Sequence, residues 1–180
     1  MRQTNADYRA YKVDTSYQYY INNWFLEMDL MCMSSANISF MVTPYFIGIV
    51  LGGFFCTLPD TYGRKRSCIF ALFMASVAQT IVIFIPDYRI RFAMFFILGL
   101  TQIKNCVCYN WLSECTSQPY KALSFTYINM FDSLTVVITC THFLLISRDW
   151  INVPLVFCGI TWLAFLLSLM CPESPRWHLI

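Results

Sequence analysis

The chain has 180 residues, of which 58% are hydrophobic and only 12% are charged, and its formal net charge is +2. A soluble domain usually carries about twice that share of charged residues, so the composition predicts a protein whose solvent is mostly lipid. The small net charge argues against a nucleic-acid partner, and the cysteines and histidines lack the spacing of a zinc site. We therefore expect an integral membrane protein without a metal or another cofactor.

The first 37 residues are polar and aromatic, and they contain no continuous apolar stretch. They also lack the basic start, apolar run and cleavage site of a secretory signal. Glu27 and Asp29 disfavour a membrane span near residues 24–33. We expect an extramembrane segment over residues 1–37 that lies on the membrane surface or against a partner.

Five apolar stretches follow, and each has about the length that a helix needs to cross a bilayer. They cover residues 38–58, 68–85, 92–111, 122–146 and 151–170. Lipid offers the backbone no hydrogen-bond partner, so helices are the expected conformation of these stretches. The fold class is therefore an all-α integral membrane bundle of about five helices over residues 38–171, followed by a short tail at 172–180.

The basic residues in the loops bear on the orientation of this bundle. With five spans, the 59–67 loop, the 112–121 loop and the tail share one side. They hold more bases than the short loops of the other side, which favours an orientation of the 59–67 loop toward the cytosol or the mitochondrial matrix. The short loops of the other side hold Arg89, Arg91 and Arg148, and the bases of the amino-terminal segment offset the difference.

The connection LPDTYGRKRS, Leu58–Ser67, concentrates one acid and three bases in a chain that is poor in charge. An anchor of the positive-inside type would explain the bases alone. The order of residues suggests more, because Gly63 permits a turn with positive φ. Asp60 could then reach the next helix or an arginine. Asp60, Gly63, Arg64 and Lys65 thus predict a clasp between two helices at the membrane surface.

These four residues resemble the signature loop between the second and third spans of the major facilitator superfamily. EMDLMC (27–32), SRDW (147–150) and PESPRW (172–177) resemble motifs of its organic cation/anion transporters, and one acid and one base match their pair between spans four and five. The matching positions outside the signature loop are Glu27, Asp29, Cys32, Glu114, Lys121, Arg148, Asp149, Trp150, Pro172, Glu173, Ser174, Pro175 and Arg176. The resemblance implies the amino-terminal half of such a carrier, about spans two to six.

A carrier of this superfamily has two six-helix halves, with substrate bound between them near the midplane. The chain ends at Ile180, shortly after the motif of the sixth span, so we expect the second half and the first span to be absent from it. Phe95 occupies the position of a family arginine, and Lys121 lacks the bidentate fork of the arginine that it replaces. These departures are expected where a moving clasp is no longer needed.

Three polar residues lie inside the apolar stretches. Lys104 could be a cation of a binding site, but snorkelling or pairing with a neighbouring subunit is the favoured interpretation. Asp132 and His142 could serve a proton relay. They point in roughly opposite directions on an ideal helix, so a separate polar contact is favoured for Asp132.

Gly48, Gly52 and Cys56 recur at every fourth position of the first apolar stretch. Such a line of small residues suits close approach of two helices. Packing within the chain is favoured over packing against another subunit.

No phosphate loop, His-Glu-x-x-His motif or nucleophile motif occurs, so we predict that the protein is not an enzyme. The favoured function is that of a transporter-derived accessory subunit without transport activity, whose exposed half-bundle face is covered by lipid and other membrane subunits. The inner mitochondrial membrane, with a respiratory complex, is its first candidate location, and the plasma membrane or an endomembrane is the alternative. The second function is a half-transporter that assembles with itself or a separate half to carry organic ions.

Overall fold

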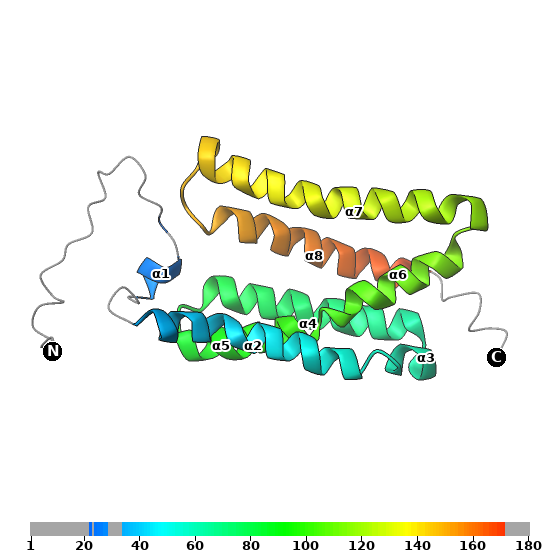
Figure 1. The fold of residues 1–180 in the computed structure, drawn as a ribbon, viewed down its shortest axis with the longest axis horizontal. Coiled ribbons are helices and arrows are strands. Elements are labelled where there is room, and N and C mark those ends of the chain that lie inside the picture. The colour runs from blue at the N-terminus through cyan, green and yellow to red at the C-terminus, as the bar shows by residue number, and fades with distance from the viewer. Residues whose placement is uncertain (1–21, 23, 29–33, 172–180) are drawn as a thin grey trace, which may run out of the picture.

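The computed structural model describes residues 22, 24–28 and 34–171, and this part of the chain is almost entirely helical. The long helices run along one common axis, with α1 near one end of the bundle and α3 at the other (Figure 1). The elements are α1 (Trp24–Glu27), α2 (Ser35–Phe54), α3 (Leu58–Tyr62), α4 (Arg64–Phe84), α5 (Tyr88–Leu100), α6 (Ile103–Cys115), α7 (Gln118–Thr141), the π-helical turn η3 (His142–Ile146) and α8 (Asn152–Met170).

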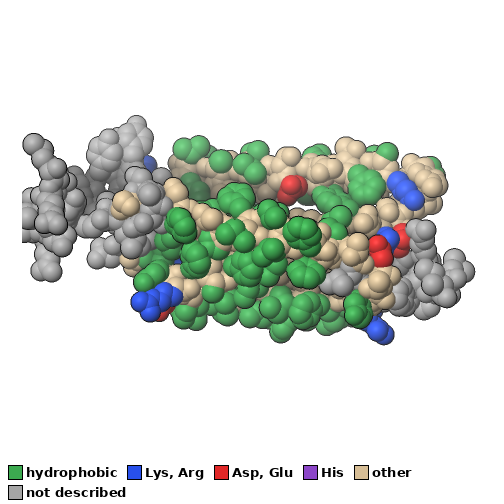
Figure 2. Space-filling model, turned by 60° about the horizontal axis from the view of Figure 1, so that its bottom comes forward, with side chains coloured by type: hydrophobic (Ala, Val, Ile, Leu, Met, Phe, Trp, Pro, Cys, Tyr) green, Lys and Arg blue, Asp and Glu red, His purple; other side chains and the backbone are tan. Residues whose placement is uncertain are grey.

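Four helical segments of the described residues are long and apolar enough to cross a membrane. They are α4, α5 with α6, α7 with η3, and α8. The apolar part of α2, Ser39–Phe54, is shorter. Figure 2 shows that apolar side chains cover the middle of one face of the bundle, whereas charged side chains gather mostly at its two ends. The prediction of an all-α membrane protein with about five apolar helices is confirmed.

The first predicted span ends earlier than expected, because α2 stops at Phe54 and the separate helix α3 begins at Leu58. Pro59 lies in the first turn of α3. A proline has no N–H to donate, and its ring clashes with the carbonyl four residues before it, here that of Phe55. The helix therefore cannot continue through residues 55–57, and the prediction of one span over 38–58 is wrong at this end.

The third predicted span is longer than expected and is broken in the middle, at Thr101 and Gln102, between α5 and α6. The backbone N–H of Gln102 donates to the carbonyl of Gly99 at 3.1 Å, three residues back, which is the tighter 3₁₀ pattern. Thr101 Oγ1 donates to the carbonyl of Leu98 at 2.9 Å. This type of side-chain bond competes with the backbone ladder and bends helices. The break turns α6 toward the start of α7 (Figure 1).

The closest packing in the described bundle is that of α2 on α5, followed by that of α4 on α8 and on α5. α2 packs mainly on α5, and α4 packs on α5, α6 and α8. The inner face of α4 is made of small residues, among them Ala71, Ala75 and Ala78. α7 differs from these helices because none of its residues is buried. A contact of α7 with α6 is the ring pair Tyr109–Phe125, with centroids 5.9 Å apart.

Candidate functional site

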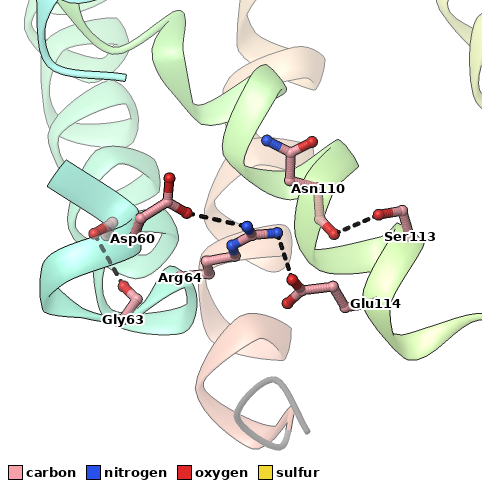
Figure 3. A network of polar contacts seen from close by, with 7 residues as sticks. Asp60, Gly63, Arg64, Asn110, Ser113 and Glu114 are labelled. Atoms are coloured by element: carbon pink, nitrogen blue, oxygen red, sulfur yellow. Dashed lines mark hydrogen bonds and ion pairs between the residues drawn. The ribbon is translucent and has the colours of Figure 1, made fainter. Parts of the chain in front are cut away.

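The charged connection forms an ion-paired cluster, which we call the Arg64 clasp (Asp60, Gly63, Arg64 and Glu114). Gly63 has a φ of 94°, a conformation that favours glycine, and this turn joins α3 to α4. Arg64 Nη2 donates to Asp60 Oδ1 at 3.0 Å, and Arg64 Nη1 forms an ion pair with Glu114 Oε1 at 2.9 Å (Figure 3). One guanidinium therefore links the α3–α4 turn to the end of α6.

The two carboxylates of the clasp have different environments. The Asp60 side chain is 63% exposed, whereas that of Glu114 is 12% exposed. Exposed ion pairs contribute only about 0.2–1 kcal/mol to stability. The pair of Arg64 with Glu114 is therefore expected to stabilise the clasp more than the pair with Asp60. The sequence analysis assigned Asp60 and Arg64 to one clasp but grouped Glu114 with Lys121. In the structure Lys121 lies half-buried in the first turn of α7. Lys65 lies half-buried next to Arg64.

A second charged cluster lies at the opposite end of the bundle, near α1, and is centred on Arg91. The Arg91 side chain is 1% exposed. Its Nη2 donates to Glu27 Oε1 at 3.0 Å, and its Nε donates to the carbonyl of Ile85 at 2.8 Å. The guanidinium carbon lies 5.3 Å from the ring centroid of Trp150, within the range of a cation–π contact. The indole N–H of Trp150 donates to Glu27 Oε2 at 3.1 Å.

Two motifs of the predicted resemblance therefore meet in space, since Glu27 belongs to EMDLMC (27–32) and Trp150 to SRDW (147–150). Asp149 extends the contact, because its Oδ1 accepts from Asn22 Nδ2 at 3.0 Å, and the N–H of Trp150 donates to the carbonyl of Asn22 at 3.0 Å. Arg148 is exposed in the same turn. The remaining motif positions, Asp29, Cys32 and Pro172, Glu173, Ser174, Pro175 and Arg176, lie outside the described residues.

Arg91 is a residue whose role the sequence analysis missed, because that analysis placed it in a loop and began the next helix at Phe92. In the structure the helix begins at Tyr88, and Asp87 caps it by accepting from the N–H of Arg89 at 2.9 Å. An aspartate just before an apolar run is a signal of a helix start. With this start, Arg91 lies within α5 instead of in a loop.

The predicted line of small residues is brought into a close contact of α2 with α5, which we call the glycine seam (Gly48, Gly52 and Gly99). A Cβ on Gly48 would overlap the backbone of Phe96 and Leu100, and a Cβ on Gly52 would come within 2.9 Å of the Leu100 carbonyl oxygen. Gly99 faces Gly48 from the α5 side. Cys56 takes no part, because it lies beyond the end of α2 and is exposed.

The largest cavity among those described has a volume of about 850 Å³ and is a widely open groove between α4, α6, α7 and α8, along which Asp132 is exposed. Asp132 and the aromatic residues Tyr109, Trp111 and Phe131 line it. Trp111 Nε1 is buried and has no hydrogen-bond partner in the described part of the chain. This arrangement offers a carboxylate, an N–H donor and aromatic faces to a small molecule.

The other two intramembrane polar residues do not join Asp132. Lys104 is half-buried just after the helix break and does not line this cavity, although it lies near two lining thiols, those of Cys68 and Cys108. His142 lies at the junction of α7 and η3, and its Nε2 is buried without a hydrogen-bond partner among the described residues. The structure therefore gives no common site of Lys104, Asp132 and His142.

Four helical segments of membrane-spanning length in the described residues place the chain in the class of polytopic membrane proteins. The family model of the sugar (and other) transporters matches residues 2–180. The chain therefore belongs to this family of the major facilitator superfamily, and the predicted resemblance is confirmed.

Related proteins include organic cation transporters from animals and plants. The chain is 29% identical over 164 residues to the mouse organic cation/carnitine transporter 2, covering 84% of the chain and 28% of that protein. It is 29% identical over 169 residues to the Arabidopsis thaliana organic cation/carnitine transporter 6, covering 84% of the chain and 30% of the relative. For the human organic cation/carnitine transporter 2, identity is 24% over 170 residues, with 88% and 29% covered. The chain thus spans less than a third of the length of these relatives, within their amino-terminal part.

Proposed function

We propose that the chain forms half of a membrane carrier for small organic ions and that a second set of helices, from another copy or a separate chain, completes it. The observation that carries this proposal is the cavity of about 850 Å³ with Asp132 in its wall. This volume falls in the range of small-molecule sites. Membership of a transporter family and the similarity to organic cation/carnitine transporters support the same function.

The electrostatics of the cavity favour a cation as the bound ion. Among the ion pairs of the described residues, none includes Asp132. An ionised carboxylate at membrane depth is costly unless a positive group or water meets it. An organic cation between Trp111 and Phe131 would supply that charge, and the aromatic faces would add cation–π attraction.

The test is uptake of labelled tetraethylammonium into vesicles that contain the chain. Asp132→Asn removes the charge while keeping the size, and we expect it to reduce uptake about tenfold or more. Asp149→Asn is the matched control, since Asp149 lies outside the cavity, and it should retain uptake. Absence of uptake by the chain in every oligomeric state, or equal uptake by Asp132→Asn, would contradict the proposal.

A second candidate function is an accessory subunit of a larger membrane complex. The exposed face of α7 favours it, because the side chains of Leu123, Phe131 and Val136 are more than half exposed in the described bundle. Phe95 and Lys121 at positions of family arginines are consistent with a role that requires no moving clasp. Other membrane subunits would then cover α7.

Native electrophoresis of the source membranes separates the two functions. Migration in a large complex with defined partners, without uptake, supports the subunit, whereas a homodimer or a pair with a second half-bundle supports the carrier. Fractionation of the same membranes would identify the compartment, for which the inner mitochondrial membrane and the plasma membrane or an endomembrane are the proposals.

A further inference from the structure

An open groove of about 530 Å³ lies along α4 at the end of the bundle that α3 marks in Figure 1. It shares no lining residue with the groove that contains Asp132. Residues of α5, of α6 and of the break between them form its opposite wall. The α4 residues that line it are Arg66, Ser67, Phe70, Ala71 and Met74. The sequence analysis and the proposed function assign no role to this groove.

The groove extends from the end of the bundle that holds the Arg64 clasp toward the apolar middle. Arg66 lies in the first turn of α4, and Met74 lies eight residues further along the same helix. At about 1.5 Å per residue this separation is about 12 Å. One leaflet contributes about 15 Å of hydrocarbon, half of a core of about 30 Å. The groove is therefore about as long as one leaflet is deep.

The hydroxyl groups on the walls of the groove already have hydrogen-bond partners within the chain. Ser67 Oγ donates to the carbonyl of Gly63 at 3.0 Å, and Thr101 Oγ1 donates to that of Leu98 at 2.9 Å. Most other lining residues are apolar. A hydrocarbon chain can therefore lie in the groove without leaving these two hydroxyl groups unpaired.

Arg66 gives the shallow end of the groove a positive charge. It is the charged residue among the described lining residues, and it is exposed. None of the ion pairs of the described residues includes it. The two acids of the Arg64 clasp, Asp60 and Glu114, pair with Arg64 instead. The groove thus combines an apolar length with an exposed guanidinium at its membrane-surface end.

We infer that this groove binds an anionic phospholipid. The lipid phosphate accepts hydrogen bonds from the guanidinium of Arg66, whose planar fork suits a phosphate group. One acyl chain lies against Phe70 and Met74 of α4. A zwitterionic lipid brings its own cation, which reduces the attraction to Arg66, and a free phosphate would leave the apolar length empty. The inference does not depend on either candidate function.

Native mass spectrometry of the full chain, released from a neutral detergent, measures the binding of added lipids. Dioleoyl phosphatidylglycerol is the anionic probe, dioleoyl phosphatidylcholine is the zwitterionic match with the same chains, and glycerol phosphate is a head group without chains. We expect phosphatidylglycerol to bind about tenfold more tightly than phosphatidylcholine, which corresponds to about 1.4 kcal/mol. Equal binding of the two lipids would overturn the inference, and competition by glycerol phosphate would make the site one for free phosphate.

Two variants connect this binding to the groove. Arg66→Gln removes the charge and should weaken phosphatidylglycerol about tenfold while leaving phosphatidylcholine unchanged. Met74→Trp fills the deep end of the groove and should weaken both lipids. Arg148→Gln is the matched control, because Arg148 is also an exposed arginine but lies outside the groove, and it should bind both lipids as the wild type does. Circular dichroism establishes that each variant is folded.

Three further outcomes would overturn the inference. Unchanged binding of phosphatidylglycerol by Arg66→Gln would show that the phosphate binds elsewhere. An equal loss in Arg148→Gln would show that the lipid responds to net charge and not to this groove. A second copy of the chain is the competing occupant, and dimers that bind no lipid and that Met74→Trp dissociates would assign the groove to a protein interface.

Discussion

The α2 and α7 helices are both apolar and 20 or more residues long, yet they pack in opposite ways. The glycine seam brings the backbone of α2 against that of α5. α7 contains no glycine, and none of its residues is buried. Several of its hydroxyl side chains bond to the backbone of the same helix, as Ser124 does to the carbonyl of Tyr120 at 3.0 Å.

This difference shows that apolar composition places a helix in a membrane but does not attach it to its neighbours. Lipid is as apolar as a leucine side chain, so helices associate through close packing and interhelical polar contacts. The seam has the small residues that permit such packing. α7 instead offers Asp132 and a broad apolar face, which is the pattern expected of a helix that completes its packing with a partner or lipid.

The largest expected effect is on the buried ion pair of Arg91, which lies on α5, the helix that packs against α2. Glu27→Ala removes the counter-ion of Arg91, and a buried charge without its partner destabilises a protein by about 3–5 kcal/mol. Asp132→Ala, on α7, removes a charge without breaking a described ion pair and should not destabilise the isolated chain. Unfolding of both variants in micelles, followed by circular dichroism, tests this contrast, which equal losses of stability would refute.

The next effect concerns the seam itself. Gly48→Leu forces a side chain into the backbone of α5, and overpacking of this kind costs about 3 kcal/mol. Gly53→Leu is the matched control on the same helix, because a Cβ at Gly53 meets no atom within 4 Å. The free energy of unfolding of the two variants should differ by most of this amount. A Gly48→Leu variant as stable as Gly53→Leu would show that α2 does not need close contact with α5.

A smaller effect is expected at the Arg64 clasp, which lies at the other end of the bundle from Arg91. Arg64→Ala loses both ion pairs and should cost about 1–2 kcal/mol, since one partner is largely buried. Asp60→Ala loses only the exposed pair and should cost about 0.5 kcal/mol or less. Raising the salt concentration should remove a larger fraction of the Asp60→Ala effect than of the Arg64→Ala effect, because the pair with Glu114 is the less exposed one. The free energy of unfolding of each variant is measured at low and high salt concentration. Equal losses in Arg64→Ala and Asp60→Ala would show that the pair with Glu114 adds nothing to the stability of the clasp.

The smallest effect is expected on α7. Ile138 is 53% exposed, so Ile138→Ala should change the stability of the isolated chain by less than about 0.5 kcal/mol. Ile83→Ala is the buried counterpart on α4, 6% exposed, and should cost about 2 kcal/mol. If a partner covers α7, Ile138→Ala should weaken the complex even though it leaves the chain stable. Co-purification of the partner with each variant measures this second effect.

Local sequence features predicted much of the fold and part of the candidate site. The apolar runs indicated the helices, because a segment in lipid must satisfy its own backbone. Gly63 indicated the turn, and the charges of Asp60, Arg64 and Lys65 around it indicated a clasp between two helices, although not that Asp60 pairs with Arg64. The line of Gly48 and Gly52 indicated a packing face. These features depend on residues within one or two helical turns of each other, so a linear pattern can reveal them.

The helix break at Thr101 and Gln102 could not be predicted in this way. A threonine and a glutamine occur in many continuous helices, and the effect of Thr101 depends on which carbonyl its hydroxyl meets. The predicted span over 92–111 therefore has the correct location but lacks the bend. The cation–π contact of Trp150 with Arg91 and the hydrogen bonds of Trp150 could not be predicted either, because a tryptophan near a membrane surface commonly serves as an interfacial anchor.

The sequence by itself determined that the chain is a helical membrane protein with charges at the helix ends and a glycine turn at Gly63, because hydropathy and backbone freedom are local properties. Only the tertiary structure decided which distant groups meet. Arg91 pairs with Glu27 across 64 residues, and Trp150 bonds to the same carboxylate across 123 residues. The tertiary structure also decided that α2 is packed and α7 is open, since each depends on the shape of the neighbouring helix surface. No single stretch of sequence encodes that shape.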